Sequence, residues 1–250
     1  MAKLVDSPFK IYGTLDDLNF YPSADGNIVR MKGKTGITKE QFRNNPIFEP
    51  IWKQGAAFGF CSLKAKVFKG LVQPFYTQVH AGSLFGRCIQ LLLAILHEGT
   101  PQDDLQMQFT EGLSTDSAKQ FLLGFEGNEH CTLNRVLTTP IAFDWERLQL
   151  SITQLNSSTA ILWPEGATQV HVQLAISNWN CATDFFETCY SNTLILYKSD
   201  DLNSLDFALT LPQEHHLWLA FIHFRFGYVQ YNKVKFLPKL FHSVTLIGVR

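Results

Sequence analysis

The histidines are the side chains in this 250-residue sequence that are best suited to metal binding, and they are scattered along it. A close group lies near the C-terminus and comprises His215, His216 and His223. On one strand, His215 and His223 would share a face but lie about 26 Å apart, at about 3.3 Å per residue, too far to bind one ion. His171 could meet one of them across neighbouring strands. The spacing supplies no four-ligand set, so we predict no metal and no cofactor.

The carboxylates give no stronger indication of catalysis. The adjacent pairs Asp16-Asp17, Asp103-Asp104 and Asp200-Asp201 fall in turn-like stretches, where acidic side chains face solvent or cap helices. The sequence also contains no phosphate-binding glycine loop, nucleophile elbow or H-E-x-x-H motif. We therefore predict that the protein is not an enzyme.

Cysteine use favours a reducing compartment. The five cysteines show no C-x-x-C spacing and are Cys61, Cys88, Cys131, Cys181 and Cys189. We expect reduced and mostly buried thiols, although Cys181 and Cys189 could meet across a hairpin and contribute to a zinc site. The longest strongly apolar stretch, residues 88–96, is shorter than the roughly 20 residues of a membrane span. Because residues 1–10 also do not resemble a secretory signal, we expect a cytoplasmic protein without membrane contact.

Basic and aromatic residues alternate near the N-terminus. The residues that we select as partner-binding candidates are Phe20, Tyr21, Arg30, Lys32 and Lys34. This composition suits a groove for single-stranded nucleic acid, and it equally suits an exposed arm that docks on a protein. Residues 1–90 carry 12 Lys and Arg against 6 Asp and Glu, whereas residues 91–250 carry 9 against 16. The charge asymmetry therefore permits nucleic-acid contact, or head-to-tail packing of subunits.

These candidates need a hairpin to position them. Residues 18–22 and 27–33 read as two strands, and Asp25-Gly26 supplies the tight reversal between them. An isolated strand pair is marginal in water, so we expect it to dock on the β region of its own chain or on a neighbouring subunit.

Helical signals follow the hairpin. Thr38 and Gln41 form a capping-box pattern that predicts a short helix to about Asn44. Helical spacing then predicts helices at residues 51–69, with a basic outer face of Lys53, Lys64, Lys66 and Lys69, at 82–97 with Ser83 as the cap, and at 115–124.

Beyond residue 133 the hydrophobic period changes from helical to two. The clearest alternating segments are residues 141–143, 148–152, 170–176, 193–197, 207–211, 218–228 and 243–249. We predict an α+β protein with an N-terminal hairpin arm (1–45), a helical segment (46–132) and an antiparallel β-sandwich-like domain (133–250). We also expect the β domain to pack independently and the arm to lie outside the core.

The hairpin motif resembles a large family of uncharacterised bacterial proteins. The resemblance rests on the pattern GxxxxLxFYxxxDGxxVRxKG, which begins at Gly13, on Pro46-x-Phe48, and on Phe58-Gly59. Members usually carry an acidic residue where this chain has Ala57. The resemblance supports the domain plan and implies no reaction.

Together these observations predict a non-enzymatic structural or assembly protein that contacts other proteins through its N-terminal arm. Self-association or a larger assembly is the expected partnership. A binding module for nucleic acid or glycan is the alternative.

Overall fold

A computed structural model describes residues 2–4, 12–23, 26–33, 36–147, 149–207, 209–212 and 217–250. The chain divides into two compact units, Met1–Lys53 and Gln54–Arg250. The boundary expected after residue 45 thus falls slightly later, and the one expected after residue 132 falls inside the second unit. Several residues selected from the sequence lie outside the described residues, namely Asp25, Lys34, Leu148, His215 and His216.

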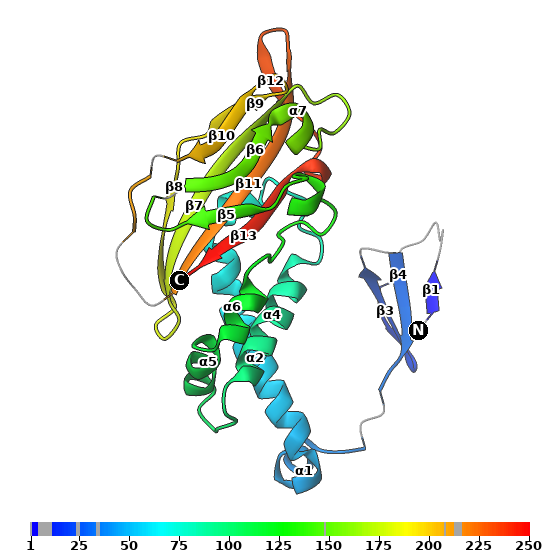
Figure 1. The fold of residues 1–250 in the computed structure, drawn as a ribbon. Coiled ribbons are helices and arrows are strands. Elements are labelled where there is room, and N and C mark those ends of the chain that lie inside the picture. Colours follow the sequence, from blue (N-terminus) through cyan, green and yellow to red (C-terminus); the bar gives the residue numbers. More distant parts are fainter. Residues whose placement is uncertain are drawn as a thin grey trace. The chain divides into compact units, whose positions relative to one another are not determined.

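The first unit contains a four-stranded antiparallel sheet. Its strands are β1 (Ala2–Leu4), β2 (Gly13–Leu15), β3 (Leu18–Ser23) and β4 (Gly26–Met31). The order in the sheet is β1-β4-β3-β2, and the predicted hairpin is the central β3–β4 pair (Figure 1). The hairpin is therefore confirmed, and it gains a short strand on each side that the sequence did not indicate.

The first unit also contains a short capped helix. Helix α1 (Lys39–Asn44) starts after Thr38, whose hydroxyl accepts a hydrogen bond from the Gln41 N–H while the Gln41 side chain accepts one from the Thr38 N–H. The predicted capping box is therefore confirmed. A 3₁₀ turn, η1 (Pro46–Phe48), leads into the long helix that follows.

Helices occupy the chain from residue 49 to residue 122. They are α2 (Glu49–Leu71), α3 (Gln73–Tyr76), α4 (Leu84–Glu98), α5 (Leu105–Leu113) and α6 (Asp116–Leu122). The three predicted helices correspond to α2, α4 and α6, whereas α5 was not expected. Ser83 precedes α4 as predicted, but its hydroxyl hydrogen-bonds the Glu129 carboxylate rather than the helix backbone.

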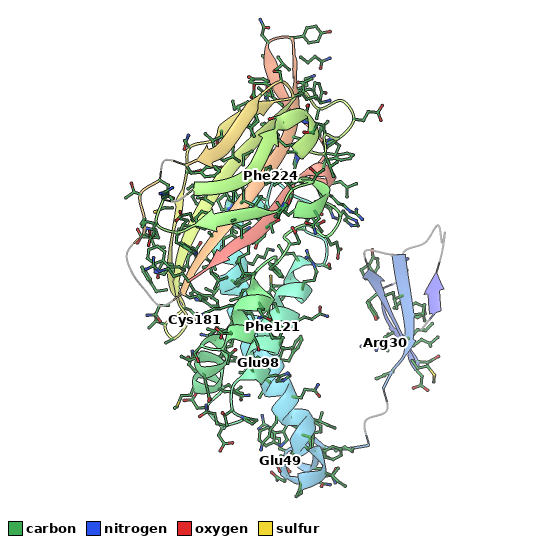
Figure 2. All side chains as sticks on the ribbon, viewed as in Figure 1. Arg30, Glu49, Glu98, Phe121, Cys181 and Phe224 are labelled. Carbon is green, nitrogen blue, oxygen red and sulfur yellow. The ribbon has the colours of Figure 1, made fainter. Side chains whose placement is uncertain are left out.

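Lys64 does not belong to the exposed basic face that the sequence predicted for α2. Its ammonium group is buried and donates hydrogen bonds to the Cys181 carbonyl oxygen at 2.6 Å and to Asp184 Oδ1 at 2.8 Å. The Gln106 side chain of α5 donates to the same carbonyl at 3.1 Å. Lys64 thus fastens α2 to the end of the β7–β8 hairpin, where Cys181 lies (Figure 2).

Two antiparallel sheets make up the rest of the second unit. The smaller sheet has the order β10-β6-β5 and consists of β5 (Ile141–Asp144), β6 (Gln149–Asn156) and β10 (Asp201–Asp206). The larger sheet consists of β7 (Gln169–Asn180), β8 (Phe185–Tyr190), β9 (Leu194–Tyr197), β11 (Leu217–Gln230), β12 (Lys233–Phe236) and β13 (Ser243–Val249). Short helical turns precede β5 at η2 (Leu133–Arg135), join β6 to β7 at α7 (Ser157–Ala160) and join β12 to β13 at η3 (Lys239–Phe241).

The long strands β7 and β11 pair with each other at the centre of the larger sheet. β8 and β9 both pair with β7, whereas β12 and β13 both pair with β11. The α+β class is confirmed, as is the antiparallel pairing. The strand expected at residues 207–211 is misplaced, because pairing with β6 ends at Asp206.

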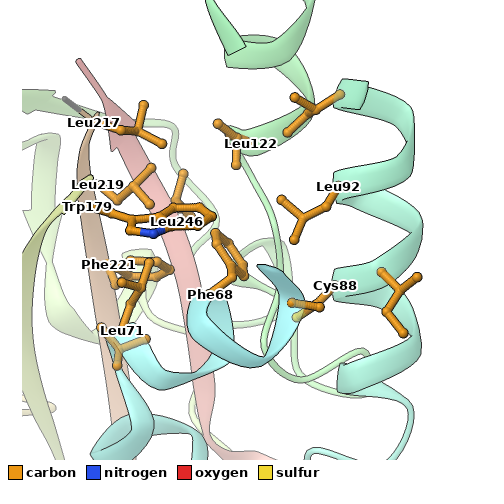
Figure 3. Packing of buried hydrophobic residues seen from close by; sticks show 14 of the residues in the cluster. Phe68, Leu71, Cys88, Leu92, Leu122, Trp179, Leu217, Leu219, Phe221 and Leu246 are labelled. Atoms are coloured by element: carbon orange, nitrogen blue, oxygen red, sulfur yellow. The ribbon is translucent and has the colours of Figure 1, made fainter. Parts of the chain in front are cut away.

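Each face of the larger sheet supports a hydrophobic core. On one face, Trp179, Phe221 and Leu246 pack against Phe68 of α2 and Leu92 of α4 (Figure 3). On the other face, alternate residues of β7 and β11 form a second core with the smaller sheet; they include Val172, Leu174, Ile222 and Phe224. The second unit is therefore three layers, with helices, the larger sheet and the smaller sheet in that order.

The β region consequently does not pack alone. Its helix-facing side chains, Trp179, Phe221 and Leu246 among them, are fully buried in a core that α2, α4 and α6 complete. An isolated fragment from residue 134 onward would expose this face to water. The expectation of an independent β domain therefore does not hold in this structure.

Candidate partner-binding surface

The N-terminal sheet presents one apolar face. Leu18 lies opposite Met31 and Phe20 lies opposite Val29, while Leu15 of β2 lies opposite Leu18. Directly opposed residues of antiparallel strands point to the same side of the sheet. We call these five residues the apolar face. Three of them are strongly exposed, with Leu15 at 64%, Leu18 at 39% and Met31 at 72% of full exposure.

The opposite face of the sheet is polar. Asn19 lies opposite Arg30, and the Thr14 hydroxyl donates a hydrogen bond to Asn19 Oδ1 at 2.6 Å. The Arg30 guanidinium lies 5.4 Å from the centre of the Tyr21 ring, within the range of a cation–π contact. This face thus combines a cation, an aromatic ring and hydrogen-bonding groups.

The structure separates the residues that the sequence grouped together. Phe20 belongs to the apolar face, whereas Tyr21 and Arg30 share the polar one. Lys32 is exposed just beyond β4, where its N–H bonds the Asp17 carbonyl oxygen. Leu15 was missed, although the alternation around Gly13-Thr-Leu is a weak strand signal that could have indicated it.

The first unit has no interior of its own among its described residues. Every residue described between positions 12 and 53 whose exposure is assigned is partly or fully exposed, including all members of the apolar face. Apolar side chains of a sheet are stabilised when they are removed from water, and those of this face are not buried within the unit. The apolar face is therefore the candidate contact surface of this unit.

The described histidines and cysteines of the second unit are dispersed. Within the described ranges, no group of three His, Cys, Asp or Glu side chains is placed to hold an ion. His171 lies opposite Arg225, and Cys189 lies opposite Ile176 rather than near Cys181. All five cysteines are unpaired and four are buried, as expected. Burial raises the pKa of both Cys61 and Cys88 to about 12, which makes them poor nucleophiles at neutral pH.

A shallow hollow adjoins helix α1. It is lined by Gly36, Ile37, Gln41, Asn44, Asn45 and Phe48. None of these side chains is an acid, a base or a nucleophile. The hollow therefore offers shape and amide groups but no catalytic chemistry.

Comparison with protein-family models, curated proteins and solved structures finds no match for this chain. In the part of the chain that the structure describes, no helix combines the length and apolar character needed to cross a membrane.

Proposed function

We propose that this protein is a non-enzymatic assembly protein that associates with further copies of itself through the apolar face of its N-terminal sheet. The observation that supports the proposal is the exposure of Leu15, Leu18 and Met31 on a sheet with no buried residue among those described. Burying such side chains contributes about 1.5 to 3 kcal/mol each. Contact with a second protein surface would supply the layer that the sheet lacks.

Electrostatics favours another copy as the partner. Arg30 and Lys32 lie on or beside the sheet, and residues 91–250 carry 16 acidic against 9 basic side chains. A basic arm on one molecule is thereby attracted to the acidic part of the next. Exposed ion pairs beside the interface would contribute only about 0 to 1 kcal/mol each, so apolar contact provides most of the affinity, while charge attracts the two molecules at longer range.

Sedimentation velocity over a range of protein concentrations tests this assignment. We expect the double variant Leu18→Ser and Met31→Ser to sediment as a monomer under conditions in which the unmodified chain associates. The matched control is Leu162→Ser with Tyr231→Ser, which changes two exposed apolar side chains of the second unit. Association that survives the first pair of changes, or that the control pair abolishes equally, would contradict the proposal.

The polar face favours a second candidate, the binding of single-stranded nucleic acid or a glycan. Tyr21 offers a stacking surface and Arg30 a charge beside it, which are the groups that such ligands use. The nucleic-acid version predicts binding of a labelled oligonucleotide that weakens steeply with salt and is lost in Tyr21→Ala and Arg30→Ala variants. Binding that ignores salt, or that these variants retain, would exclude it.

The wider setting belongs to the same proposal. We place the chain in the cytoplasm, because its unpaired and mostly buried thiols suit a reducing compartment. Its N-terminal motif groups it with the bacterial family that it resembles. Assembly through the arm would then be a property to test in other chains that carry the motif.

A further inference from the structure

The helix-facing side of the larger sheet continues beyond the core as a polar surface. Arg225 of β11 lies opposite His171 of β7, and Gly227 lies opposite both Gln169 of β7 and Phe236 of β12. Opposed residues share a face, so Gln169, His171, Arg225 and Phe236 lie together. We call these four residues the Arg225 face. It lies toward β9 and β12, at the end of the sheet away from α5 and α6 (Figure 1).

Arg225 is a cation with no counter-ion among the residues that the structure describes. Its guanidinium carbon lies 3.4 Å from the centre of the Phe236 ring, so the ring covers one side of the guanidinium plane. Its Nε is buried and has no hydrogen-bond partner, and no described carboxylate lies within ion-pair distance. Burial lowers the pKa of this guanidinium. A partly buried and unpaired charge is costly, and proteins rarely keep one without a use for it.

The groups around Arg225 add further hydrogen-bonding capacity without negative charge. The Gln169 amide nitrogen lies 2.8 Å from His171 Nε2, and the His171 ring packs edge-on against Phe236. Next along the same face, His223 has a buried Nε2 with no partner. Burial and the Arg225 charge lower the pKa of His171, and burial, His242 and Arg225 lower that of His223. Among the described residues, the charge at the centre of this face is therefore the positive charge of Arg225.

Apolar side chains surround this polar centre. On strand β9, Ile195 lies opposite His171 and Tyr197 lies opposite Gln169. On strand β11, Val229 lies two residues beyond Gly227 and opposite Val234 of β12. Ile195, Tyr197, Val229 and Val234 are exposed by 44%, 46%, 53% and 43%. A ligand seated on Arg225 would therefore place the rest of its body against apolar surface.

We propose that the Arg225 face binds a carboxylate carried on an apolar body, with the guanidinium of Arg225 as the counter-ion and the exposed apolar side chains as the wall. The planar guanidinium group matches a carboxylate in shape. The carboxylate can accept two parallel hydrogen bonds from nitrogens in the guanidinium plane, and Phe236 lies over the face of that plane. One unpaired cation balances a monoanion. A phosphate ester would bring a charge of about −1.5 to −2 to a site with a single fixed positive charge. The proposal of this site does not depend on the proposed role of the N-terminal sheet.

Titration of the full chain with sodium octanoate, followed by NMR of the His171 imidazole, tests the site. We expect saturable binding that raises the His171 pKa, because a nearby negative charge favours the charged imidazole. Acetate should bind at least about tenfold more weakly, since it lacks the apolar body. Inorganic phosphate should not shift the resonance in a saturable way.

Variants distinguish the site from general anion binding. Arg225→Met should weaken octanoate binding at least about tenfold, whereas Lys233→Met on the neighbouring strand β12 should leave it unchanged. Arg225→Met removes an unpartnered buried nitrogen, so thermal unfolding should confirm that the variant is folded. Equal octanoate binding by Arg225→Met and the unmodified chain would overturn the site. The absence of any saturable shift would do the same, and phosphate binding as tight as octanoate would overturn the carboxylate assignment.

Discussion

Glu126 is the carboxylate whose environment has the clearest consequence for stability. Its side chain accepts hydrogen bonds from the Leu133 N–H at 2.8 Å and from the Thr245 hydroxyl at 2.6 Å. Burial nonetheless raises its pKa from 4.5 to about 6, against the opposing effects of these bonds and of Arg87. The folded state therefore binds a proton more readily than the unfolded chain between these two values.

We predict that Glu126→Gln changes how stability depends on pH. A raised carboxyl pKa means that the folded state is favoured progressively as the pH falls from about 6 to 4.5. The unmodified chain should therefore gain about 1.6 kcal/mol relative to Glu126→Gln between pH 7 and pH 4.5, out of the roughly 2 kcal/mol that the whole shift represents at 1.36 kcal/mol per pKa unit. Urea unfolding of both proteins at the two pH values measures the difference. A difference that does not change with pH would show that Glu126 has an ordinary pKa.

Single residues show where prediction from sequence succeeds and where it fails. The Thr38 capping box is a local pattern, so its spacing sufficed. Lys64 shares a helix face with Cys61 and Phe68, and its position predicted burial while its charge predicted exposure. The outcome depended on Asp184 and the Cys181 carbonyl oxygen, which lie more than a hundred residues away in sequence. No local pattern reveals such partners.

Helices α4 and α5 approach each other closely at two glycines, Gly99 and Gly112. A Cβ atom on Gly112 of α5 would lie 2.1 Å from the Ile95 carbonyl oxygen of α4, and one on Gly99 would lie 2.0 Å from the Gln108 carbonyl oxygen. Both neighbours are backbone atoms, which cannot move aside without displacing a helix. The spacing of this helix pair therefore depends on the two glycines.

We predict that Gly112→Ala lowers the free energy of unfolding by at least about 2 kcal/mol, because overpacking outweighs the helix propensity of alanine. Gly86→Ala is the matched control on α4, since a Cβ there meets nothing within 4 Å. It should stabilise the protein by about 0.5 to 1 kcal/mol. Urea unfolding measures both. A neutral Gly112→Ala variant would contradict the close approach of the helices.

Strand β12 and helix α5 were not predicted because their local sequence signals are weak. Strand β12 follows a two-residue turn, Tyr231-Asn232, in which both residues have positive φ of 52° and 57°. Such turns usually contain glycine, so this pair gave no turn signal. Helix α5 is short, and its Asp104 cap was recognised only as part of a turn. Long periodic segments such as α4 and β11 were placed correctly because burial of one or both faces controls them.

At the scale of the whole molecule, the second unit joins its helices and its two sheets through two hydrophobic cores. The part of the larger sheet that carries both cores is covered by helices on one face and by the smaller sheet on the other. Composition and period indicated helices and strands, but they did not indicate that the two would share a core. The division after Lys53 leaves both hydrophobic cores within Gln54–Arg250. The N-terminal sheet contributes no described residue to either core.

Deletion of residues 1–35, followed by measurement of native mass and thermal unfolding, tests this account most directly. The full chain should show a mass above that of a monomer which rises with concentration. The truncated chain should be monomeric and should unfold at nearly the same temperature, because both hydrophobic cores remain intact. A full chain that stays monomeric at every concentration would contradict the assembly proposal. A truncated chain that fails to fold would show that the sheet belongs to the core of the protein.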